Sequence, residues 1–504
     1  MADTICFQDI SRYYASTNVQ ANDHVSFSIG SGEIHAICGE NGAGKTTLMR
    51  ILFGLERPDS GTILLDGEAV SLTSPADSIA HGIGMVHQHF MLVPSFSVTE
   101  NIMLGNEKAK KGFLQKKDER AFVQKLSETF HLPIDAGAIV ETLPVGLLQR
   151  VEILKMLARN VRIIILDEPT AVLTPQEVGP FLETLKELAR SGHTILFISH
   201  KLQEVLSVAD KITVMRQGKV IGTKLRSETD MEDLAMMMVG RKVVLHVDKK
   251  LACPKGNILE ADHLSAVNVN GTKLLDDVSF RIRSGEIYGI AGVTGNGQDT
   301  LVSCISGLVK PASGEVRLEG ASMTKESVRA RRHRGMAHVP EDRIAMGLNM
   351  QSSVEENILM GYETQEPYCK KGFLHMGQVQ SLTEELIKSY SIAGASCDSP
   401  VSMLSGGNMQ KVVLGRELAG NPKLLIVNQP TRGLDVGSIE FVHKMIIAER
   451  DRGVAVLLIS VELEEILSLS DRVGVLFSGR LQGELEGDAI NEKNIGLFMV
   501  GGHV

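Results

Sequence analysis

One stretch constrains this chain more than any other: Gly39, Glu40, Asn41, Gly42, Ala43, Gly44, Lys45 and Thr46. It matches the phosphate-binding loop pattern G-x-x-x-x-G-K-[ST] at every fixed position. Residues 34–38 before it predict a strand and residues 46–52 after it a helix, which is the setting the pattern requires. Glycines let backbone N–H groups turn toward a polyphosphate, and the helix start adds the positive end of its dipole. The loop predicts a nucleoside triphosphate site.

Polar side chains for phosphate chemistry come from this loop and from a second predicted strand. Lys45 supplies positive charge for the outer phosphates, and the Thr46 hydroxyl can bind Mg²⁺. Asp167 and Glu168 follow four apolar residues, so both carboxylates lie at the end of a buried strand. Asp167 there can hold the Mg²⁺ water shell, and Glu168 can orient or deprotonate a water. The alternative for this pair is an acidic cap before a proline turn.

Three further positions are weaker candidates. His200, after a predicted strand at residues 195–199, can hydrogen-bond the terminal phosphate, although a histidine at a strand end is more often structural. Gln88 can bind Mg²⁺ or water and sense the nucleotide. Tyr14 can stack on an adenine, and the adjacent Tyr13 is an equal candidate on chemistry alone.

Length and composition limit the class of protein. At 504 residues the chain is too long for one core. A net charge of −9 argues against a dedicated nucleic-acid binder. The six cysteines form no C-x-x-C pair, which fits a reducing cytosol rather than a zinc site or a disulfide framework. With no signal peptide and no apolar run near the ~18 residues of a membrane span, another chain would have to hold it at a membrane.

The sequence is one module written twice. VSFSIGSGEI at residues 25–34 returns as VSFRIRSGEI at 278–287, and DEPT at 167–170 returns as NQPT at 428–431. A repeat of about 250 residues is a duplicated domain. We predict domains at residues 1–241 and 257–504 with a linker at 242–256. Strand runs alternating with helical patterns predict a largely parallel α/β sheet in each, with helical subdomains near residues 90–145 and 345–403.

The second half contains another anion-binding helix start. It consists of Ser405, Gly406 and Gly407, which open a helix predicted at residues 409–418. This stretch has no lysine and would not hold a nucleotide unaided. We interpret it as a lid over a phosphate bound elsewhere.

Together these motifs resemble the ATP-binding subunits of ABC transporters, and the tandem layout is similar to the double-domain ATPases of bacterial sugar and nucleoside importers. The resemblance covers essentially the whole chain. It implies two tandem P-loop ATPase domains of α/β class, each with a RecA-like core, a helical subdomain and an antiparallel β part. It also implies that each ATP, with Mg²⁺, lies between the phosphate loop of one domain and the Ser-Gly-Gly signature of the other.

The resemblance also implies a role for each candidate. The catalytic residues would be Glu168, His200 and Gln88. Thr46, Gln88 and Asp167 would hold the metal. The nucleotide would be bound by Tyr14 rather than Tyr13, by Thr47, by Ser405, Gly406 and Gly407, and by the loop residues Gly39, Glu40, Asn41, Gly42, Ala43, Gly44, Lys45 and Thr46.

Departures from the family pattern fall on one composite site. In the first half the signature serine and one glycine are replaced by Pro144 and Val145. The second half loses its lysine, its hydroxyl, both acids and its histidine, which become Gln298, Asp299, Asn428, Gln429 and Val461. Asn and Gln cannot take a proton or supply charge to Mg²⁺. We expect one site to hydrolyse ATP and the other at most to hold nucleotide.

We therefore expect a subunit that hydrolyses ATP to energise a membrane importer. The resemblance ranks a purine nucleoside as the solute before riboflavin and a simple sugar; residues 84–94 look closest to the nucleoside-import branch, which includes riboflavin importers. The expected partners are two transmembrane permease subunits and an extracytoplasmic solute-binding protein, with no nucleic acid. The expected place is the cytoplasmic face of the inner membrane, peripherally.

Two other functions are open alternatives. One is a soluble tandem ABC ATPase acting on ribosomes or DNA, and the other is a nucleotide-binding regulator without turnover. A run of basic residues could contact nucleic acid, but we interpret it as a solvated helix face. The run consists of Arg329, Arg331, Arg332 and Arg334.

Overall fold

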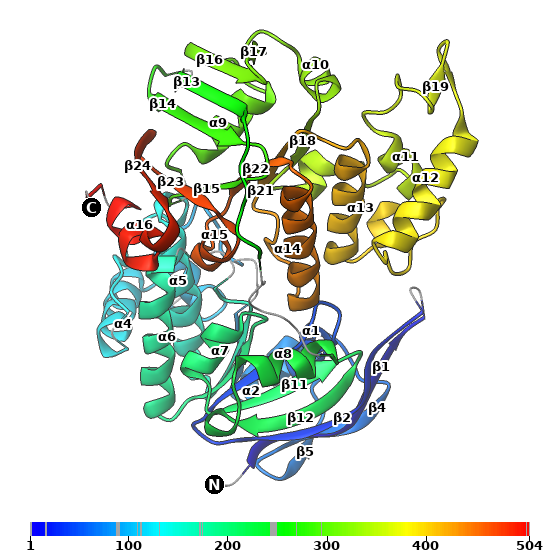
Figure 1. Cartoon of the computed structure of the whole chain (residues 1–504). Coiled ribbons are helices and arrows are strands. Elements are labelled where there is room, and N and C mark those ends of the chain that lie inside the picture. The colour runs from blue at the N-terminus through cyan, green and yellow to red at the C-terminus, as the bar shows by residue number, and fades with distance from the viewer. Residues whose placement is uncertain are drawn as a thin grey trace. The chain divides into compact units, whose positions relative to one another are not determined.

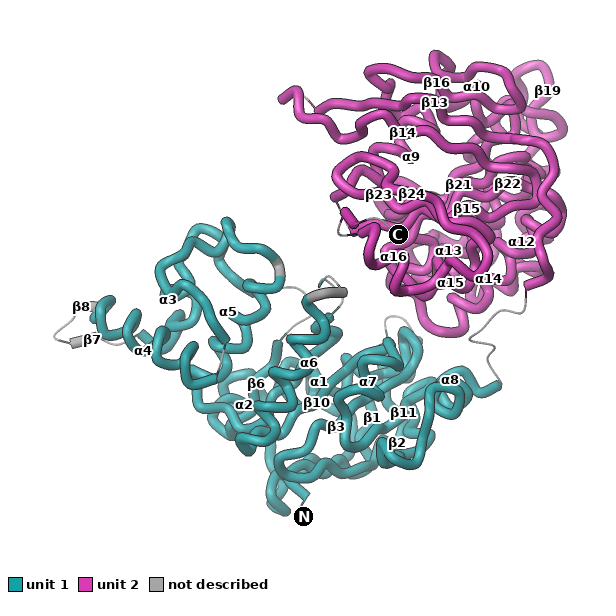
Figure 2. Tube along the Cα trace, turned by 60° about the vertical axis from the view of Figure 1, so that its left-hand side comes forward, with its two compact units in different colours: residues 1–243 teal, residues 244–504 magenta. Residues whose placement is uncertain are grey.

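The chain folds into two compact units, residues 1–243 and 244–504, shown in teal and magenta in Figure 2. The boundary lies within the segment 242–256 that the sequence offers as a linker. The computed structural model describes residues 3–15, 18–86, 91–107, 109–110, 113–130, 132–170, 173, 175–241, 249–268, 270–293, 295–499 and 501–502. Each unit repeats the same succession of strands and helices (Figure 1).

The first unit is built on a six-stranded sheet in the order β12-β11-β3-β10-β9-β6. Its strands are β3 (Ile34–Cys38), β6 (Ile83–Val86), β9 (Ile163–Asp167), β10 (Thr194–Ile198), β11 (Lys211–Arg216) and β12 (Lys219–Leu225). All neighbours pair in parallel except β12, which is antiparallel to β11. Every residue of β3, β6, β9 and β10 is buried, as expected for parallel strands covered on both faces.

An antiparallel sheet in the order β2-β1-β4-β5 completes the first unit's β structure. Its strands are β1 (Asp3–Tyr14), β2 (Val19–Gly30), β4 (Ser60–Leu65) and β5 (Glu68–Val70). Phe7 and Ile63 of this sheet share one apolar core with Leu48 of α1 (Lys45–Leu52) and Ile37 of β3. The phosphate loop therefore connects elements that both belong to this core.

Helices make up the rest of the first unit. α3 (Val98–Met103) and α4 (Lys116–Thr129) lie in the predicted helical part, and α5 (Val145–Leu157) begins where the predicted bounds of 90–145 end, so the helical part continues past them. This part also contains a small hairpin of β7 (Ala109–Lys110) and β8 (Phe113–Leu114). Strands of two residues are too short to be predicted from the periodicity of apolar residues. The other helices are α2 (Pro75–Ala80), α6 (Pro175–Arg190), α7 (Leu202–Val208) and α8 (Met231–Val239).

The second unit repeats both sheets. The six-stranded sheet has the order β18-β21-β22-β15-β23-β24, which is the same arrangement named from the other edge. Its strands are β15 (Ile287–Ala291), β18 (Met336–Val339), β21 (Leu424–Asn428), β22 (Ala455–Ile459), β23 (Arg472–Phe477) and β24 (Arg480–Glu486). The antiparallel sheet consists of β13 (Asn257–Val267), β14 (Lys273–Arg283), β16 (Ser313–Leu318) and β17 (Ala321–Ser322).

The second unit's helices follow the same plan. In Figure 1, α11 (Val354–Leu359), α12 (Met376–Ser389) and α13 (Gly406–Ala419) lie together on one side of β21 and β22, with a hairpin of β19 (Cys369–Lys370) and β20 (Phe373–Leu374). The others are α9 (Gln298–Ser306), α10 (Val328–His333), α14 (Val436–Asp451), α15 (Leu463–Leu469) and α16 (Glu492–Met499). None of the described helices combines the length and apolar character that a membrane span needs.

The basic run at the end of α10 is solvated only in part: Arg329 and Arg334 are exposed as expected, but the interpretation is wrong for Arg331 and Arg332. Arg331 is only 1% exposed, and its Nη1 donates to the carbonyls of Cys304 and Ile305 at 2.8 and 2.6 Å. Arg332 forms an ion pair of 2.6 Å with the buried Glu417. The last carbonyls of α9 have no partner within their own helix, and Arg331 supplies donors to them.

Candidate nucleotide site

The phosphate loop joins the end of β3 to the start of α1. Gly44 caps α1 with φ 95°, in the left-handed region that favours glycine. A Cβ at this position would lie 2.0 Å from the carbonyl oxygen of Ala21, so the backbone of β2 leaves room for no other residue. The tight loop that the sequence predicts is thus set by close packing against the antiparallel sheet.

Lys45 lies inside the loop rather than in solvent. The residue is 6% exposed, and its ammonium group donates to the carbonyl oxygens of Gly39 and Glu40 at 2.8 and 2.9 Å. An ammonium group has three donors, and a phosphate entering the loop would share them. The backbone carbonyls of the loop therefore hold the Lys45 ammonium group, the predicted phosphate-binding charge, inside the loop.

Thr46 and Asp167 come together although they are far apart in the sequence. The Thr46 hydroxyl donates to Oδ1 of Asp167 at 3.4 Å. Asp167 is the last residue of β9 and is 5% exposed. Burial, followed by the charge of Glu168, raises the pKa of Asp167. A cation beside this carboxylate would offset both effects, and hydroxyl and carboxylate oxygens are ligands that Mg²⁺ accepts.

Glu168 and His200 form one hydrogen-bonded pair. The distance from Nδ1 of His200 to Oε1 of Glu168 is 2.9 Å, and both side chains are largely buried. They meet because β9 and β10 are neighbouring parallel strands. Burial alone would raise the pKa of Glu168, but the hydrogen bond and the charge of the neighbouring His200, together with Lys45, lower it. The carboxylate is therefore ionised at neutral pH and can accept a proton from water.

The two tyrosines of β1 differ in their surroundings. Tyr14 donates from its hydroxyl to Glu56, and the Arg12 guanidinium lies 5.1 Å from its ring centre. Burial and Glu56 raise the pKa of Tyr14, and hydrogen bonding with Thr47 lowers it. Tyr13 is 43% exposed and bonds to Asn18 instead. Of the two, Tyr14 is the one that contacts the helix following the phosphate loop.

The remaining predicted residues lie elsewhere. Gln88 lies outside the described residues. Ser405, Gly406 and Gly407 belong to the second unit, where Ser405 is the exposed N-cap of α13 and accepts from the backbone N–H of Asn408 at 3.4 Å. This cap starts α13 three residues before the predicted position. A Cβ on Gly407 would lie 2.1 Å from Oγ of Ser438, so any larger residue would have to displace that hydroxyl.

Comparison with known proteins identifies the family. The model of the ABC transporter family matches residues 22–171 and 275–432, once in each unit. The chain belongs to the ABC transporter family. Its two units are thus two ABC domains, and the nucleotide of this family is ATP.

The relatives cover nearly the whole chain. A nucleoside import ATP-binding protein, NupA, of Lactococcus lactis is 45% identical over 96% of this chain and 96% of its own length. A guanosine import ATP-binding protein, NupO, of Bacillus subtilis is 44% identical over 97% of this chain and 96% of its own. A chain in the structure of an archaeal ribosome recycling factor with a ribosomal stalk protein is 19% identical, covers 98% of this chain and 92% of that one, and has a TM-score of 0.65. This last likeness is one of fold.

The second ABC domain keeps the loop but not its chemistry. Gly297 caps α9 with φ 107°, as Gly44 caps α1. Gln298 donates to the carbonyl of Val293 at 3.1 Å in place of an ammonium group. Gln429 has φ 50°, like Glu168 with φ 47°, and its Oε1 accepts from the backbone N–H of Val461 at 3.2 Å. The second domain thus has the same backbone at this turn, with an amide in place of the Glu168 carboxylate.

One residue at this second site, Glu341, was not among the candidates expected from the sequence. Glu341 lies two positions after β18, where Gln88 stands two positions after β6. Matching strand registers, with Val86 opposite Leu166 and Val339 opposite Val427, make these positions equivalent. Aligning the repeats through these two strands would have found it.

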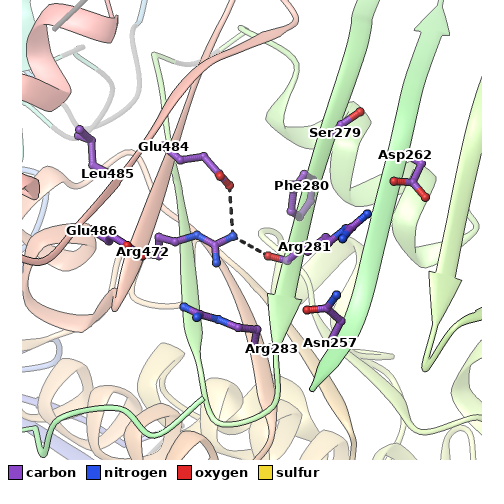
Figure 3. Close-up of a pocket in the computed structure, with 10 residues that line it drawn as sticks. All are labelled: Asn257, Asp262, Ser279, Phe280, Arg281, Arg283, Arg472, Glu484, Leu485 and Glu486. Atoms are coloured by element: carbon purple, nitrogen blue, oxygen red, sulfur yellow. Dashed lines mark hydrogen bonds and ion pairs between the residues drawn. The ribbon is translucent and has the colours of Figure 1, made fainter. Parts of the chain in front are cut away.

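A separate cavity of about 640 Å³ lies beside β14 and β24 in the second domain (Figure 3). Arg472 crosses it, donating to the carbonyl of Arg281 at 2.7 Å and to Glu484 at 3.2 Å. Arg283 pairs with the buried Glu286 at 2.8 Å. The cavity contains none of the predicted site residues, and these ion pairs are internal to the domain.

Proposed function

We propose that the first ABC domain hydrolyses ATP and that hydrolysis drives the import of a purine nucleoside by a membrane permease. The observation that carries the proposal is the Glu168–His200 pair beside Asp167 and Lys45, a base next to a phosphate loop. Glu168 accepts the proton of the water that attacks the γ-phosphorus. The bond between that phosphorus and the bridging oxygen breaks, leaving ADP and inorganic phosphate.

The other predicted residues bind and orient the substrate. Mg²⁺, when bound, would neutralise charge on the β- and γ-phosphates, and Thr46, Asp167 and Gln88 would hold it. Lys45 and the N–H groups of the loop bind the phosphates. His200 positions the Glu168 carboxylate and contacts the terminal phosphate. Tyr14 stacks on the adenine.

Ser405, Gly406 and Gly407 complete the site from the second domain. Ser405 is exposed at the first turn of α13, a helix of 14 residues whose free N–H groups favour an anion. In the first domain the equivalent helix α5 is preceded by Pro144, which makes no side-chain cap. We therefore propose a single hydrolytic site that pairs the first phosphate loop with the second signature.

The permease contact is proposed for the segments that follow β6 and β18. Met91 is 62% exposed in the first domain, and Ile344 and Met346 are 52% and 59% exposed in the second. Exposed apolar side chains of this kind suit a protein interface. The partners are two transmembrane permease subunits and an extracytoplasmic solute-binding protein, and the chain works peripherally at the cytoplasmic face of the inner membrane.

The names of the two import relatives support the solute class, since one is named for nucleoside import and the other for import of guanosine, which is a purine nucleoside. The likeness to the structure with the ribosome recycling factor is of fold alone and gives no support for action on ribosomes. The test is uptake of radiolabelled guanosine in cells that lack this chain and in cells that carry it again. Restoration by wild type but not by Glu168→Gln is expected. Uptake that does not depend on this chain would refute the solute assignment.

A further inference from the structure

The two ABC domains contain one identical hairpin sequence. KKGFL occurs at residues 110–114 and again at 370–374, whereas the residues directly before and after this run differ between the domains. The run forms part of β7 and β8 in the first domain and of β19 and β20 in the second, and in both the first lysine pairs with the phenylalanine. The second domain lacks the lysine and the acids of the first nucleotide site but has the same hairpin. Both hairpins are therefore suited to the same kind of contact.

In the second domain, where the side chains of the hairpin are described, the whole tip is exposed. Residues 370–376 are all exposed, and Phe373 is 76% exposed. Figure 1 shows this hairpin projecting beyond α12. Lys371 and Gly372 have φ 55° and 83°, the two positive values of a type I′ turn. Such turns favour asparagine or aspartate before the glycine, so the turn itself gives no reason for a lysine there.

The hairpins are cationic although the chain as a whole carries a net charge of −9. Residues 108–117 contain five lysines and no acid, and residues 367–383 contain two lysines and no acid. Lys370 lies directly opposite Phe373, so the two side chains share one face of the hairpin. Neither Lys370 nor Lys371 forms an ion pair within the described part of the chain. An exposed ring thus lies beside two ammonium groups whose charge is available to a partner.

We propose that both KKGFL hairpins bind the anionic phospholipid surface of a membrane. The lysines contact headgroup phosphates, and the phenylalanine inserts among the acyl chains. Lysine clusters attract anionic lipids, and an inserted aromatic ring adds buried apolar area. A specific protein partner would also constrain the residues that flank the run, and these differ between the domains. A lipid surface presents the same chemistry to both hairpins. This contact goes beyond the proposed transport and depends neither on the solute nor on hydrolysis.

The first test uses the absence of tryptophan from the chain, which makes Phe373→Trp a single fluorescent reporter at the tip. With vesicles of phosphatidylglycerol and phosphatidylcholine in equal parts, its emission should shift to shorter wavelength, and lipids brominated on their acyl chains should quench it. Vesicles of phosphatidylcholine alone should cause neither change. Salt at about 1 M should largely reverse the shift, because the Debye length falls to about 3 Å.

The matched control is Leu251→Trp, which places the reporter at a position that is 95% exposed and lies outside both hairpins. Its emission should stay the same when the anionic vesicles are added.

The second test is sedimentation of the full chain with the same anionic vesicles. Lys110→Gln with Lys111→Gln, and Lys370→Gln with Lys371→Gln, should each weaken vesicle binding by at least about fivefold, since each lysine near such a surface contributes to the attraction. ATP hydrolysis without vesicles should stay within about twofold of wild type in both variants, because distant sites act independently. That activity also shows that the variants are folded.

The control for charge is Lys310→Gln with Lys493→Gln, which removes two exposed lysines outside the hairpins. Vesicle binding should change by less than about twofold.

Four outcomes would overturn the proposal. They are an unchanged emission of Phe373→Trp with anionic vesicles, an equal shift with phosphatidylcholine alone, undiminished vesicle binding in both hairpin variants, and an equal loss in the control for charge. A shift that occurs only in membranes that contain the permease would mean that the tip binds protein, and the lipid contact would be refuted.

Discussion

The two ABC domains differ most in chemistry at the place where their backbones agree best. The residue after the buried strand is Glu168 in the first domain and Gln429 in the second, with φ 47° and 50°. Each backbone N–H donates to the neighbouring strand, to Ile198 at 3.0 Å and to Ile459 at 2.8 Å. The left-handed region costs a non-glycine residue about 1–2 kcal/mol. Because the second domain adopts it without a catalytic acid, this turn belongs to the fold and not to catalysis.

A buried contact next to this turn is also common to both domains. Thr170 donates to Glu204 at 2.5 Å, and Thr431 donates to Glu465 at 2.9 Å. The second domain adds His443, whose Nε2 lies 2.9 Å from Oε1 of Glu465. The buried contact is thus present in both domains, whereas the carboxylate that we propose as the proton acceptor is present only in the first. The comparison separates residues that build the site from residues that react.

The largest effect is expected from removing the proposed base. Glu168→Gln keeps size and hydrogen bonding but cannot accept a proton, so steady ATP hydrolysis should fall by about 10²–10⁴-fold while MgATP still binds. Phosphate release and nucleotide binding are the measurements. The matched change Gln429→Glu should leave the rate within about twofold of wild type. A rate above about a tenth of wild type in Glu168→Gln would remove Glu168 from the catalytic role.

The next effect compares the two signature helices. Ser405→Arg places a bulky cation at the start of α13, and ATPase activity should fall by about 10²–10³-fold, as when a donor to developing charge is removed. Pro144→Arg changes the equivalent position before α5, and its rate should stay close to wild type. Comparable losses in both variants would mean that both composite sites turn over, and the single-site mechanism would be wrong.

A smaller effect is expected for the shared buried contact. Thr170→Val and Thr431→Val each deprive a buried glutamate of a donor, which typically costs about 1–3 kcal/mol of local stability. The cost in the second domain should fall at the lower end, because His443 still bonds to Glu465. Hydrogen exchange of β9 and β21 in the full chain measures each domain separately. Destabilisation of only one domain would show that this contact is not equivalent in the two.

Sequence patterns predicted the architecture well, because the repeat, the phosphate loop and the apolar strand runs are local signals. β3 covers residues 34–38 as expected, and β9 and β10 lie where the apolar runs are. What the patterns missed depends on contacts between distant segments. The solvated face expected for Arg331 ignored the carbonyls at the end of α9. Glu341 is a different kind of omission, because the offset of the repeat, 278 − 25 = 253, already places it opposite Gln88 (341 − 88 = 253), and strand register agrees.

The smallest expected effect comes from giving the second domain its lysine. Gln298 occupies the position of Lys45 and is 6% exposed in the same kind of loop, so Gln298→Lys fits without rebuilding the backbone. The ammonium group adds affinity for phosphates, but binding alone does not accelerate the chemical step. Because Asn428 and Gln429 remain, the second domain has no carboxylate at the positions of Asp167 and Glu168, and ATPase activity should stay within about twofold of wild type. A sharper measurement combines Gln298→Lys with Glu168→Gln, because the first domain of this double variant should not hydrolyse ATP. Phosphate release in this double variant should match that of Glu168→Gln alone. Recovery of phosphate release to about a tenth of the wild-type rate would contradict this expectation. It would show that the missing lysine charge alone, and not the other replaced residues, prevents hydrolysis in the second domain.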